Sequence, residues 1–383
     1  MGISFGSINT GLPKDIVKKL IDAERIPIQK MEIRKSKFQE KKRLVETLIK
    51  LVEGIRSDLQ ANKTARSLRE IQVNTNEDII GVDIDKNSIS PGNYQIEVME
   101  MAQKSSALSS GFEDPDDSYI GVGYLKYNLP NGDTKEVFVD AENSSLRGIA
   151  HLINNDSENG LSATVLNDGA DADNPWRLNL ALTDTGDDNK ATWPHFYFVD
   201  GDDDFFLEFT REAKDAKVRF NGFEVEFPSN KLKTLIPGAI INLKKAKPGE
   251  EFSINISEDA EAITDKIGGI VKKVNDVLSF IKEQNRMDES TDTTKTLGGD
   301  LILQSLEGRI RGVIFTHVLT GKGYKRIGDY GVSFQKSGLI QIDPKKIEKS
   351  LSEDYGTVSQ LMVGIINEDG IKEPGFIDNL EKL

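Results

Sequence analysis

Two stretches of the chain repeat apolar residues every three or four positions, and nearly all of the strand-like sequence lies between them. The first covers residues 13–59 and the second residues 257–284. Apolar residues seven apart, with others interleaved, are typical of helices that pair along a narrow seam. The expected seam consists of Phe38, Val45, Leu48, Val52, Ile55 and Leu59 in the first stretch and of Ile263, Ile267, Ile270, Val274, Val277 and Ile281 in the second. We predict that the two stretches pack together as a helical coiled-coil stalk, with the middle of the chain as a head.

The first 35 residues differ from the rest of this helical stretch. Residues 1–12 are rich in Gly, Ser, Asn and Thr, and their apolar residues are sparse, so we expect a mobile segment over residues 1–35. An amphipathic face follows at Ile16, Val17, Leu20 and Ile21. Pro27 is then expected to kink or break the helix, because proline lacks the backbone N–H.

The middle of the chain shows the alternation of β-strands. We predict strands at residues 71–73, 79–84 and 94–98, and a loop or linker over residues 103–117. Strands at 122–129 and 135–139 are expected to join through a two-residue turn at Asn131-Gly132. A helix capped by Ser144 and strands at 161–166 and 176–182 complete a ββαββ unit. Further strands follow to residue 256, with a second two-residue turn at Asn221-Gly222.

The C-terminal part is expected to be helical again. Ser257 is the expected N-cap of the second seam helix, and Asp343 followed by Pro344 is typical of another helix start. A short helix is expected at residues 357–363, and no clear element at the end of the chain.

This pattern predicts an α+β multidomain protein. The predicted stalk domain comprises residues 36–70 and 257–383. Two β-rich head domains are expected, one formed by residues 71–117 and 212–256 and the other, the ββαββ insert, by residues 118–211.

Composition narrows the classes of function. The chain has 383 residues and a formal net charge of -14, which disfavours non-specific nucleic-acid binding because that needs a basic surface. It contains no cysteine, so disulfides and zinc-thiolate sites are excluded. No apolar run is long enough for a membrane span, and the N-terminal sequence does not have the pattern of a cleaved signal peptide.

No group of residues has the spacing of a catalytic, cofactor or metal site. His151, His195 and His317 lack partners at ligand spacing. Clusters of aspartate lie at residues 168–173, 184–188 and 202–204, but none follows the order of a calcium-binding loop, and solvated turns explain them better. The aromatics at 196–209, with Phe205 and Phe206 as the candidate contacts, are either a binding surface or core, and core packing is favoured.

Several stretches together resemble one family. They are GLPKDIVKKLIDAERIPIQKME, SPGNYQIEVMEMAQ, LRGIAHLINNDSENGLSATVLNDG, KVRFNGFEVEFPSN, IVKKVNDVLSFIKEQ and YGVSFQKSGLIQIDPKKIEKSL. In this order they resemble the bacterial flagellar filament cap family, hook-associated protein 2 (FliD). The chain is shorter than is usual there, and the family's closing amphipathic helix is not visible by Leu383.

This resemblance implies a non-enzymatic cap at the distal, extracellular tip of the flagellar filament, without a cofactor. It implies a ring-shaped homo-oligomer that promotes flagellin insertion. The expected partners are other copies of the chain, flagellin, hook-filament junction proteins, and the flagellar type III export apparatus and its chaperone. It also implies export without a cleaved signal, and filament contact through Ile16, Val17, Leu20 and Ile21.

Two alternatives stay open from the residues alone. The β head is a surface adhesin for host or prey glycans if Phe205 and Phe206 bind sugars. It is a glycosidase if the carboxylates of Asp202, Asp203 and Asp204 act on a glycosidic bond.

Overall fold

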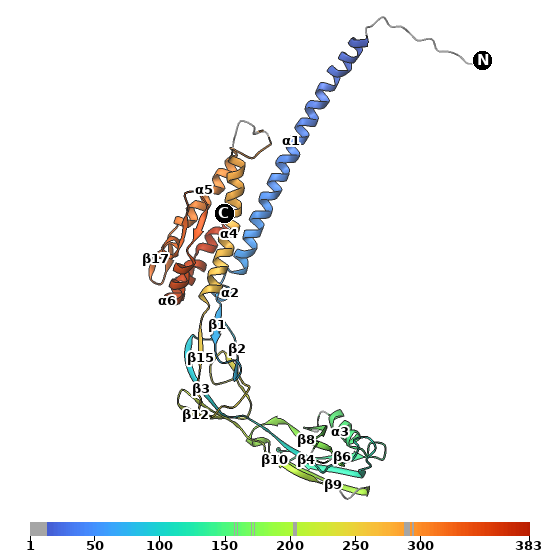
Figure 1. Ribbon diagram of the computed structural model, residues 1–383. Helices are drawn as coiled ribbons and strands as arrows, with labels where there is room; N and C mark the ends of the chain where they lie inside the picture. The colour runs from blue at the N-terminus through green and yellow to red at the C-terminus, as the bar shows by residue number, and fades with distance from the viewer. Residues whose placement is uncertain are drawn as a thin grey trace, which may run out of the picture. The chain divides into compact units, whose positions relative to one another are not determined.

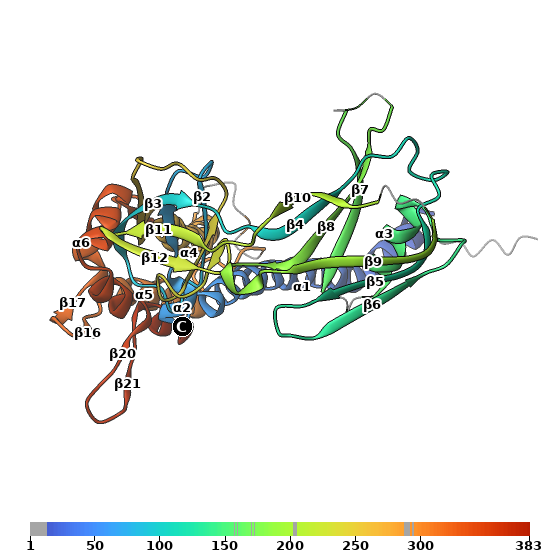
Figure 2. The ribbon, with the colours of Figure 1, turned by 90° about the horizontal axis from the view of Figure 1, so that it is seen from below.

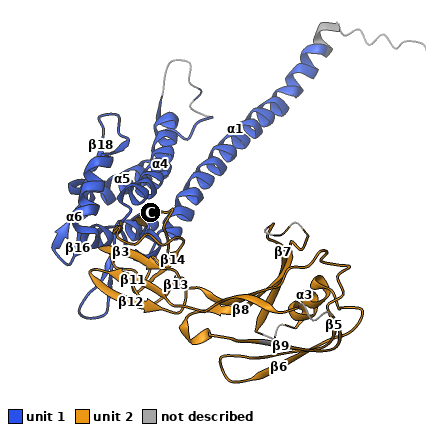
Figure 3. Ribbon diagram, turned by 60° about the horizontal axis from the view of Figure 1, so that its bottom comes forward, with its two compact units in different colours: residues 1–70, 258–383 blue, residues 71–257 orange. Residues whose placement is uncertain are grey.

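The computed structural model describes residues 14–383 except residues 157, 159, 170, 172, 202–204, 287–291 and 293–294. The chain divides into two compact units (Figures 1 and 3). Unit 1 comprises Met1–Glu70 and Glu258–Leu383, and unit 2 comprises Ile71–Ser257. The two ends of the chain therefore form one unit, and the middle forms the other.

Unit 1 is mainly helical. Its helices are α1 (Lys14–Ala61), α2 (Ala65–Leu68), α4 (Ala260–Asn285), α5 (Leu301–Phe315), α6 (Pro344–Val363) and α7 (Phe376–Glu381). Three two-stranded sheets accompany them: β16 (Val318–Thr320) with β17 (Gly323–Lys325), β18 (Val332–Phe334) with β19 (Ile340–Ile342), and β20 (Ile365–Ile366) with β21 (Lys372–Glu373). One apolar core joins α1, α2, α4, α5, α6 and α7. The expected absence of a terminal element was wrong, because α7 buries Phe376, Ile377 and Leu380 in this core.

The helix α1 continues through Pro27, so the expected break there was wrong. Proline removes one backbone hydrogen bond, the one to the carbonyl of Ala23. The residues around it are exposed, so water can satisfy that carbonyl. Of the segment that we expected to be mobile, residues 14–35 belong to α1, and residues 1–13 lie outside the described part.

Aspartates cap the helices α4, α5 and α6 of unit 1. Asp259, not the expected Ser257, caps α4 by accepting a hydrogen bond from the amide of Ala262. The strand β15 (Phe252–Glu258) extends through Ser257 and so moves the helix start. Asp343 caps α6, with Pro344 in its first turn as predicted. Within α6, Asp354 has non-helical φ and ψ angles and caps a second segment through the amide of Thr357.

The first core of unit 2 lies between two antiparallel sheets. One has the order β1-β15-β3-β11-β12 and the other β13-β14-β2. The strands are β1 (Ile71–Asn74), β2 (Ile80–Ile84), β3 (Gly92–Glu100), β11 (Ala216–Phe220), β12 (Phe223–Phe227), β13 (Lys231–Leu232) and β14 (Ala239–Leu243), with β15. Their alternate apolar residues, including Ile96, Val218, Ile241 and Ile254, are buried together.

The second core of unit 2 contains one helix and two sheets. The sheets have the orders β10-β4-β8-β7 and β6-β5-β9, and Figure 2 shows β5, β6 and β9 side by side. The elements are β4 (Lys104–Ser109), β5 (Gly121–Asn128), β6 (Thr134–Val139), α3 (Leu146–Asn155), β7 (Leu161–Asn167), β8 (Trp176–Thr185), β9 (Thr192–Gly201) and β10 (Leu207–Arg211). The predicted order ββαββ is present as β5, β6, α3, β7 and β8, but its two hairpins lie in different sheets.

Two details of this region differ from expectation. Residues 104–109 form β4 and not a loop, and half of this strand is buried. Ser145 caps α3, whereas the hydroxyl of Ser144 is buried and donates to the carbonyl of Gly121. The division into two head domains at residues 117 and 118 stays a prediction.

The turn at Asn131-Gly132 is longer than predicted. Asn128 pairs with Thr134, which leaves five residues in the loop. A two-residue turn would pair Pro130 with Asp133 and would need the N–H that proline lacks. At Asn221-Gly222, by contrast, Phe220 pairs with Phe223, and both turn residues have positive φ angles, as this turn requires.

Candidate functional site

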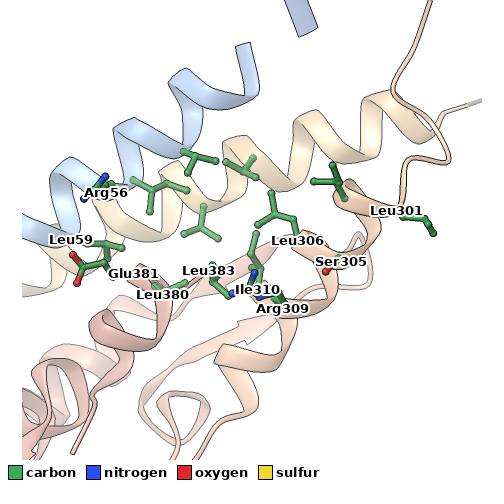
Figure 4. Close-up of a pocket in the computed structure, with 15 residues that line it drawn as sticks. Arg56, Leu59, Leu301, Ser305, Leu306, Arg309, Ile310, Leu380, Glu381 and Leu383 are labelled. Carbon is green, nitrogen blue, oxygen red and sulfur yellow. The ribbon is translucent and has the colours of Figure 1, made fainter. Parts of the chain in front are cut away.

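An open apolar groove lies in unit 1 among α1, α4, α5 and the C-terminal residues. Its volume is about 490 Å³. Figure 4 shows its lining, which is mostly aliphatic: Val52, Ile55, Leu59, Val274, Val277, Leu301, Ile302, Leu306, Ile310, Leu380 and Leu383, with Ser305, Arg56, Arg309 and Glu381. Leu301 and Ile302 are largely exposed. A groove of this composition fits apolar side chains better than a polar metabolite.

Polar contacts fix part of the groove. The guanidinium group of Arg309 donates to the carbonyl oxygen of Lys382 at 2.5 Å, which ties the C-terminal residues to α5. The ammonium group of Lys63 pairs with the carboxylate of Glu381. These two contacts therefore hold the C-terminal residues of the lining in place.

The α4 half of the predicted seam is buried throughout. Ile263, Ile267, Ile270, Val274, Val277 and Ile281 all belong to the core of unit 1. The α1 half is divided. Leu59 is 1% exposed, and Leu48 and Ile55 are half-buried against the core. Phe38, Val45 and Val52 are exposed, and Phe38 retains 73% of its accessible surface.

The α1 half is divided because a different side of α1 packs on the core of unit 1. Its packed stripe is Leu44, Leu48, Leu51, Ile55 and Leu59, at spacings of four, three, four and four residues. Leu44 and Leu51 did not belong to the predicted seam, although this spacing follows the helical period in the sequence. Phe38, Val45 and Val52 lie on the neighbouring face and stay exposed, so the expectation that they are buried against α4 was wrong.

The length of α4 also limits the pairing. The ammonium nitrogen of Lys273 lies 2.6 Å from a carboxylate oxygen of Asp58, which sets the register of the two antiparallel helices. The helix α4 ends at Asn285, about twelve residues later, so its end lies opposite residue 46 or so of α1. Phe38 lies beyond that point.

The first predicted contact face is only partly described. Leu20 and Ile21 are exposed on α1. The side chains of Ile16 and Val17 lie outside the described residues. Filament contact through these four residues stays a prediction.

The candidate aromatic pair is divided between core and surface. Phe205 is 7% exposed, and its ring contacts those of Phe112, Phe196 and Phe198. The favoured interpretation, core packing, is therefore confirmed for Phe205, which belongs to the second core of unit 2, and its alternative role as a surface contact is contradicted. Phe206 is 52% exposed. The glycan-binding interpretation loses one of the two residues that supported it.

Two of the clustered aspartates form ion pairs. Asp168 forms an ion pair with the largely buried Arg177, which also pairs with Glu208. Asp187 pairs with Lys190 at 2.6 Å. Asp202, Asp203 and Asp204 lie outside the described part. Among the described residues, no three His, Cys, Asp or Glu side chains are grouped so that they could hold a metal ion.

The two histidines whose side chains are described belong to different units. His151 lies in α3 beside the side-chain amide of Asn155, at 3.0 Å, and His317 follows α5. The side chain of His195 is outside the described residues.

Within the described part, no helix has the length and apolar composition that a membrane crossing needs.

Comparison with known families matches both ends of the chain to profiles of one family. A profile named flagellar hook-associated protein 2 N-terminus matches residues 11–105, and one named flagellar hook-associated protein 2 C-terminus matches residues 213–383. Together they cover more than two thirds of the sequence, in the order of the family. The chain belongs to the flagellar hook-associated protein 2 family.

The chain is also similar to individual proteins of this family. The B-type flagellar hook-associated protein 2 of Pseudomonas aeruginosa is 25% identical over 334 residues, which is 79% of this chain and 68% of that protein. A crystal structure of the flagellar cap protein FliD from Bdellovibrio bacteriovorus is 40% identical, with a TM-score of 0.44, and covers 48% of this chain and 99% of that one.

A third comparison supports the fold. The D1-D2-D3 domains of the flagellar cap protein FliD from Escherichia coli have a TM-score of 0.62 at 20% identity, covering 88% of this chain and 94% of that one. The two proteins therefore share a mixed α/β fold over most of their length.

Proposed function

We propose that this chain is a non-enzymatic structural cap at the distal tip of the bacterial flagellar filament, where it promotes flagellin insertion and filament elongation. The observation that carries this proposal is the ordered match of the hook-associated protein 2 profiles to both ends of the chain. The names of the Bdellovibrio bacteriovorus and Escherichia coli relatives, flagellar cap proteins, support it.

The structure of unit 1 is compatible with a protein that works by contact. The exposed apolar residues of α1 and the groove beside them offer apolar surface to other proteins. In this proposal the helices of unit 1 form the stalk or leg, in part as a coiled coil, and the β-rich residues 71–256 form the head domains.

The proposed assembly is a ring-shaped homo-oligomer that contacts flagellin and the hook-filament junction proteins. The chain is proposed to reach the extracellular tip through the flagellar type III export apparatus, with a chaperone and without a cleaved signal peptide. The absence of cysteine suits this route, because no disulfide has to form after export.

Deletion of the gene in the bacterium that encodes it tests the proposal. The expected result is cells with hooks but without filaments, and flagellin released into the medium. Restoring the gene should restore the filaments. Filaments of normal number and length in the deletion strain would contradict the proposed function.

A further inference from the structure

Two asparagines that precede a glycine lie in exposed hairpin turns of unit 2. Asn131 and Gly132 lie between β5 and β6, and Asn221 and Gly222 lie between β11 and β12. All four residues are exposed, and a Cβ atom placed on either glycine would meet no atom within 4 Å. The two pairs have the same local sequence and similar access to water, but their backbones differ. A third pair, Asn159-Gly160, begins outside the described residues.

An asparagine followed by glycine is prone to lose its side-chain amide without an enzyme. The backbone nitrogen of the glycine gives up its proton and attacks Cγ of the asparagine. The new N–Cγ bond forms as the Cγ–Nδ2 bond breaks, and Nδ2 leaves as ammonia with the proton that the backbone lost. Water then opens the cyclic imide at either carbonyl and leaves an aspartate or an isoaspartate. Glycine favours the attack because it has no side chain to obstruct its nitrogen.

The contacts of Asn131 stay within its own loop. Its side-chain oxygen accepts a hydrogen bond from the amide of Asp133 at 3.0 Å, and its Nδ2 donates to the carboxylate of Asp133 at 2.8 Å. The amide of Gly132 donates to the carbonyl of Leu129 at 2.9 Å, and the φ angle of Asn131 is not left-handed. Residues 129–132 therefore form a type I turn, in which ψ of Asn131 is about 0°. Attack on Cγ breaks the bond to Leu129 and rotates an exposed backbone bond, and the five-residue loop absorbs both changes.

Asn221, by contrast, is held by a neighbouring strand. Its amide donates to the carbonyl of Gln95 on β3 at 2.9 Å, and its side-chain oxygen accepts from the amide of Gln95 at 2.8 Å. Its φ angle is +46°, as the two-residue turn between Phe220 and Phe223 requires. The ψ angle of about +30° in such a turn places Cβ on the far side of the Cα–C bond from the nitrogen of Gly222. The imide therefore forms only after this corner of the sheet opens.

We propose that Asn131 is a site of spontaneous deamidation in the folded chain, and that the same sequence at Asn221 is protected by its turn and by β3. The product adds one negative charge to the loop and, as isoaspartate, also one methylene to its backbone. Both products lose the hydrogen bond from Nδ2 to Asp133 and place two carboxylates side by side. The loop is therefore expected to loosen, while β5 and β6 keep Leu125 and Val139 buried in the second core of unit 2.

Mass spectrometry of the aged chain tests this proposal. The folded full chain is incubated at pH 8 in oxygen-18 water, sampled over several weeks, and digested with trypsin in ordinary water. Heavy oxygen then marks deamidation that preceded the digestion. Trypsin releases residues 127–135 and residues 220–231, and fragment spectra locate the change and distinguish aspartate from isoaspartate. Asn131 is expected to react at least about tenfold faster than Asn221, because only Asn221 waits for local opening.

Controls separate the effect of the fold from that of the sequence. As free peptides, YNLPNGDTK and FNGFEVEFPSNK should react at similar rates, because neither has a fold that protects it. In urea, Asn221 of the full chain should reach the rate of its free peptide, whereas Asn131 should change little. The variant Asn131→Ser removes the reactive amide and should leave residues 127–135 unmodified. The rate at Asn131 should rise with pH, because the attacking nitrogen must lose its proton.

Three results would overturn the proposal. The first is an Asn131 that persists in the folded chain while its free peptide reacts. The second is an equal rate at Asn131 and Asn221 in the folded chain. The third is deamidation of residues 127–135 that persists in the Asn131→Ser variant. None of these measurements needs a filament or a second protein, so their outcome is independent of the proposed cap function.

Discussion

The ammonium nitrogen of Lys273 on α4 lies 2.6 Å from a carboxylate oxygen of Asp58 on α1 and 3.3 Å from the carbonyl oxygen of Gly54. These contacts join the N-terminal and C-terminal parts of the chain within unit 1. About a third of each of the two side chains is exposed, so the pair contributes to register more than to stability.

Exchanging the charges of this pair should preserve the fold. Asp58→Lys or Lys273→Asp alone places like charges together, and each should lower the melting temperature. The double variant should recover most of that loss, with a coupling free energy of about 1 kcal/mol or less. Thermal unfolding followed by circular dichroism measures this. A double variant less stable than both single variants would contradict the register.

The two stripes of α1 should respond differently to truncation. Leu59→Ala should lower the free energy of unfolding by about 2–5 kcal/mol, because Leu59 is buried in the core of unit 1. Val45→Ala, on the exposed face, should change it by less than about 0.5 kcal/mol. Denaturant titrations of both variants give the comparison. Equal losses would show that the packed face is not the one described.

The neighbouring residues Phe205 and Phe206 form a second matched pair. Phe205→Ala should destabilise unit 2 by about 3–5 kcal/mol, since it removes ring contacts with Phe112, Phe196 and Phe198. Phe206→Ala should have a small effect, because that ring is mostly exposed. Thermal melts of the two variants measure the difference. A larger loss for Phe206→Ala would contradict the burial of Phe205.

Asp354 should give unit 1 a measurable dependence on acid pH. The ion pair with Lys322, at 2.6 Å, and the hydrogen bonds from Thr357 lower the pKa of this carboxyl group from 3.8 to about 2. A lowered pKa stabilises the folded chain above pH 3.8, and this contribution is lost as the pH falls toward 2. Lys322 is largely exposed, so solvent screening limits the effect to about 1 kcal/mol.

The variant Asp354→Asn isolates this contribution. Its stability should differ from that of the unmodified chain at pH 5 and approach it at pH 2, as measured by urea titrations at a series of pH values. A difference that stays constant from pH 5 to pH 2 would show that the carboxylate charge is not responsible.

Local patterns in the sequence predicted most helices and strands. The Asp343-Pro344 start of α6 and the Asn221-Gly222 turn depend on neighbouring residues only, and both are present. The turn after Leu129 differs from the two-residue prediction because Pro130 lacks the backbone N–H that such a turn needs. The strand β4 was missed because a serine-rich stretch carries little apolar pattern, and its place in the sheet is set by β8 and β10.

The candidate site was harder to predict, because it depends on which face of α1 is covered. Two apolar patterns overlap along α1. Val45 belongs to the seven-residue repeat, and the adjacent Leu44 belongs to the stripe with spacings of three and four residues. Only the position of α4 and the point where it ends decide that Leu44 is buried and Phe38 is exposed.

The location of the chain on intact flagella tests the central claim most directly. Filaments of the bacterium that encodes it are labelled with gold-conjugated antibody against the chain and viewed by electron microscopy, with the deletion strain as the control. The cap function predicts label at the distal tip of the filaments. Label along the filament shaft, or confined to the cell surface, would contradict it.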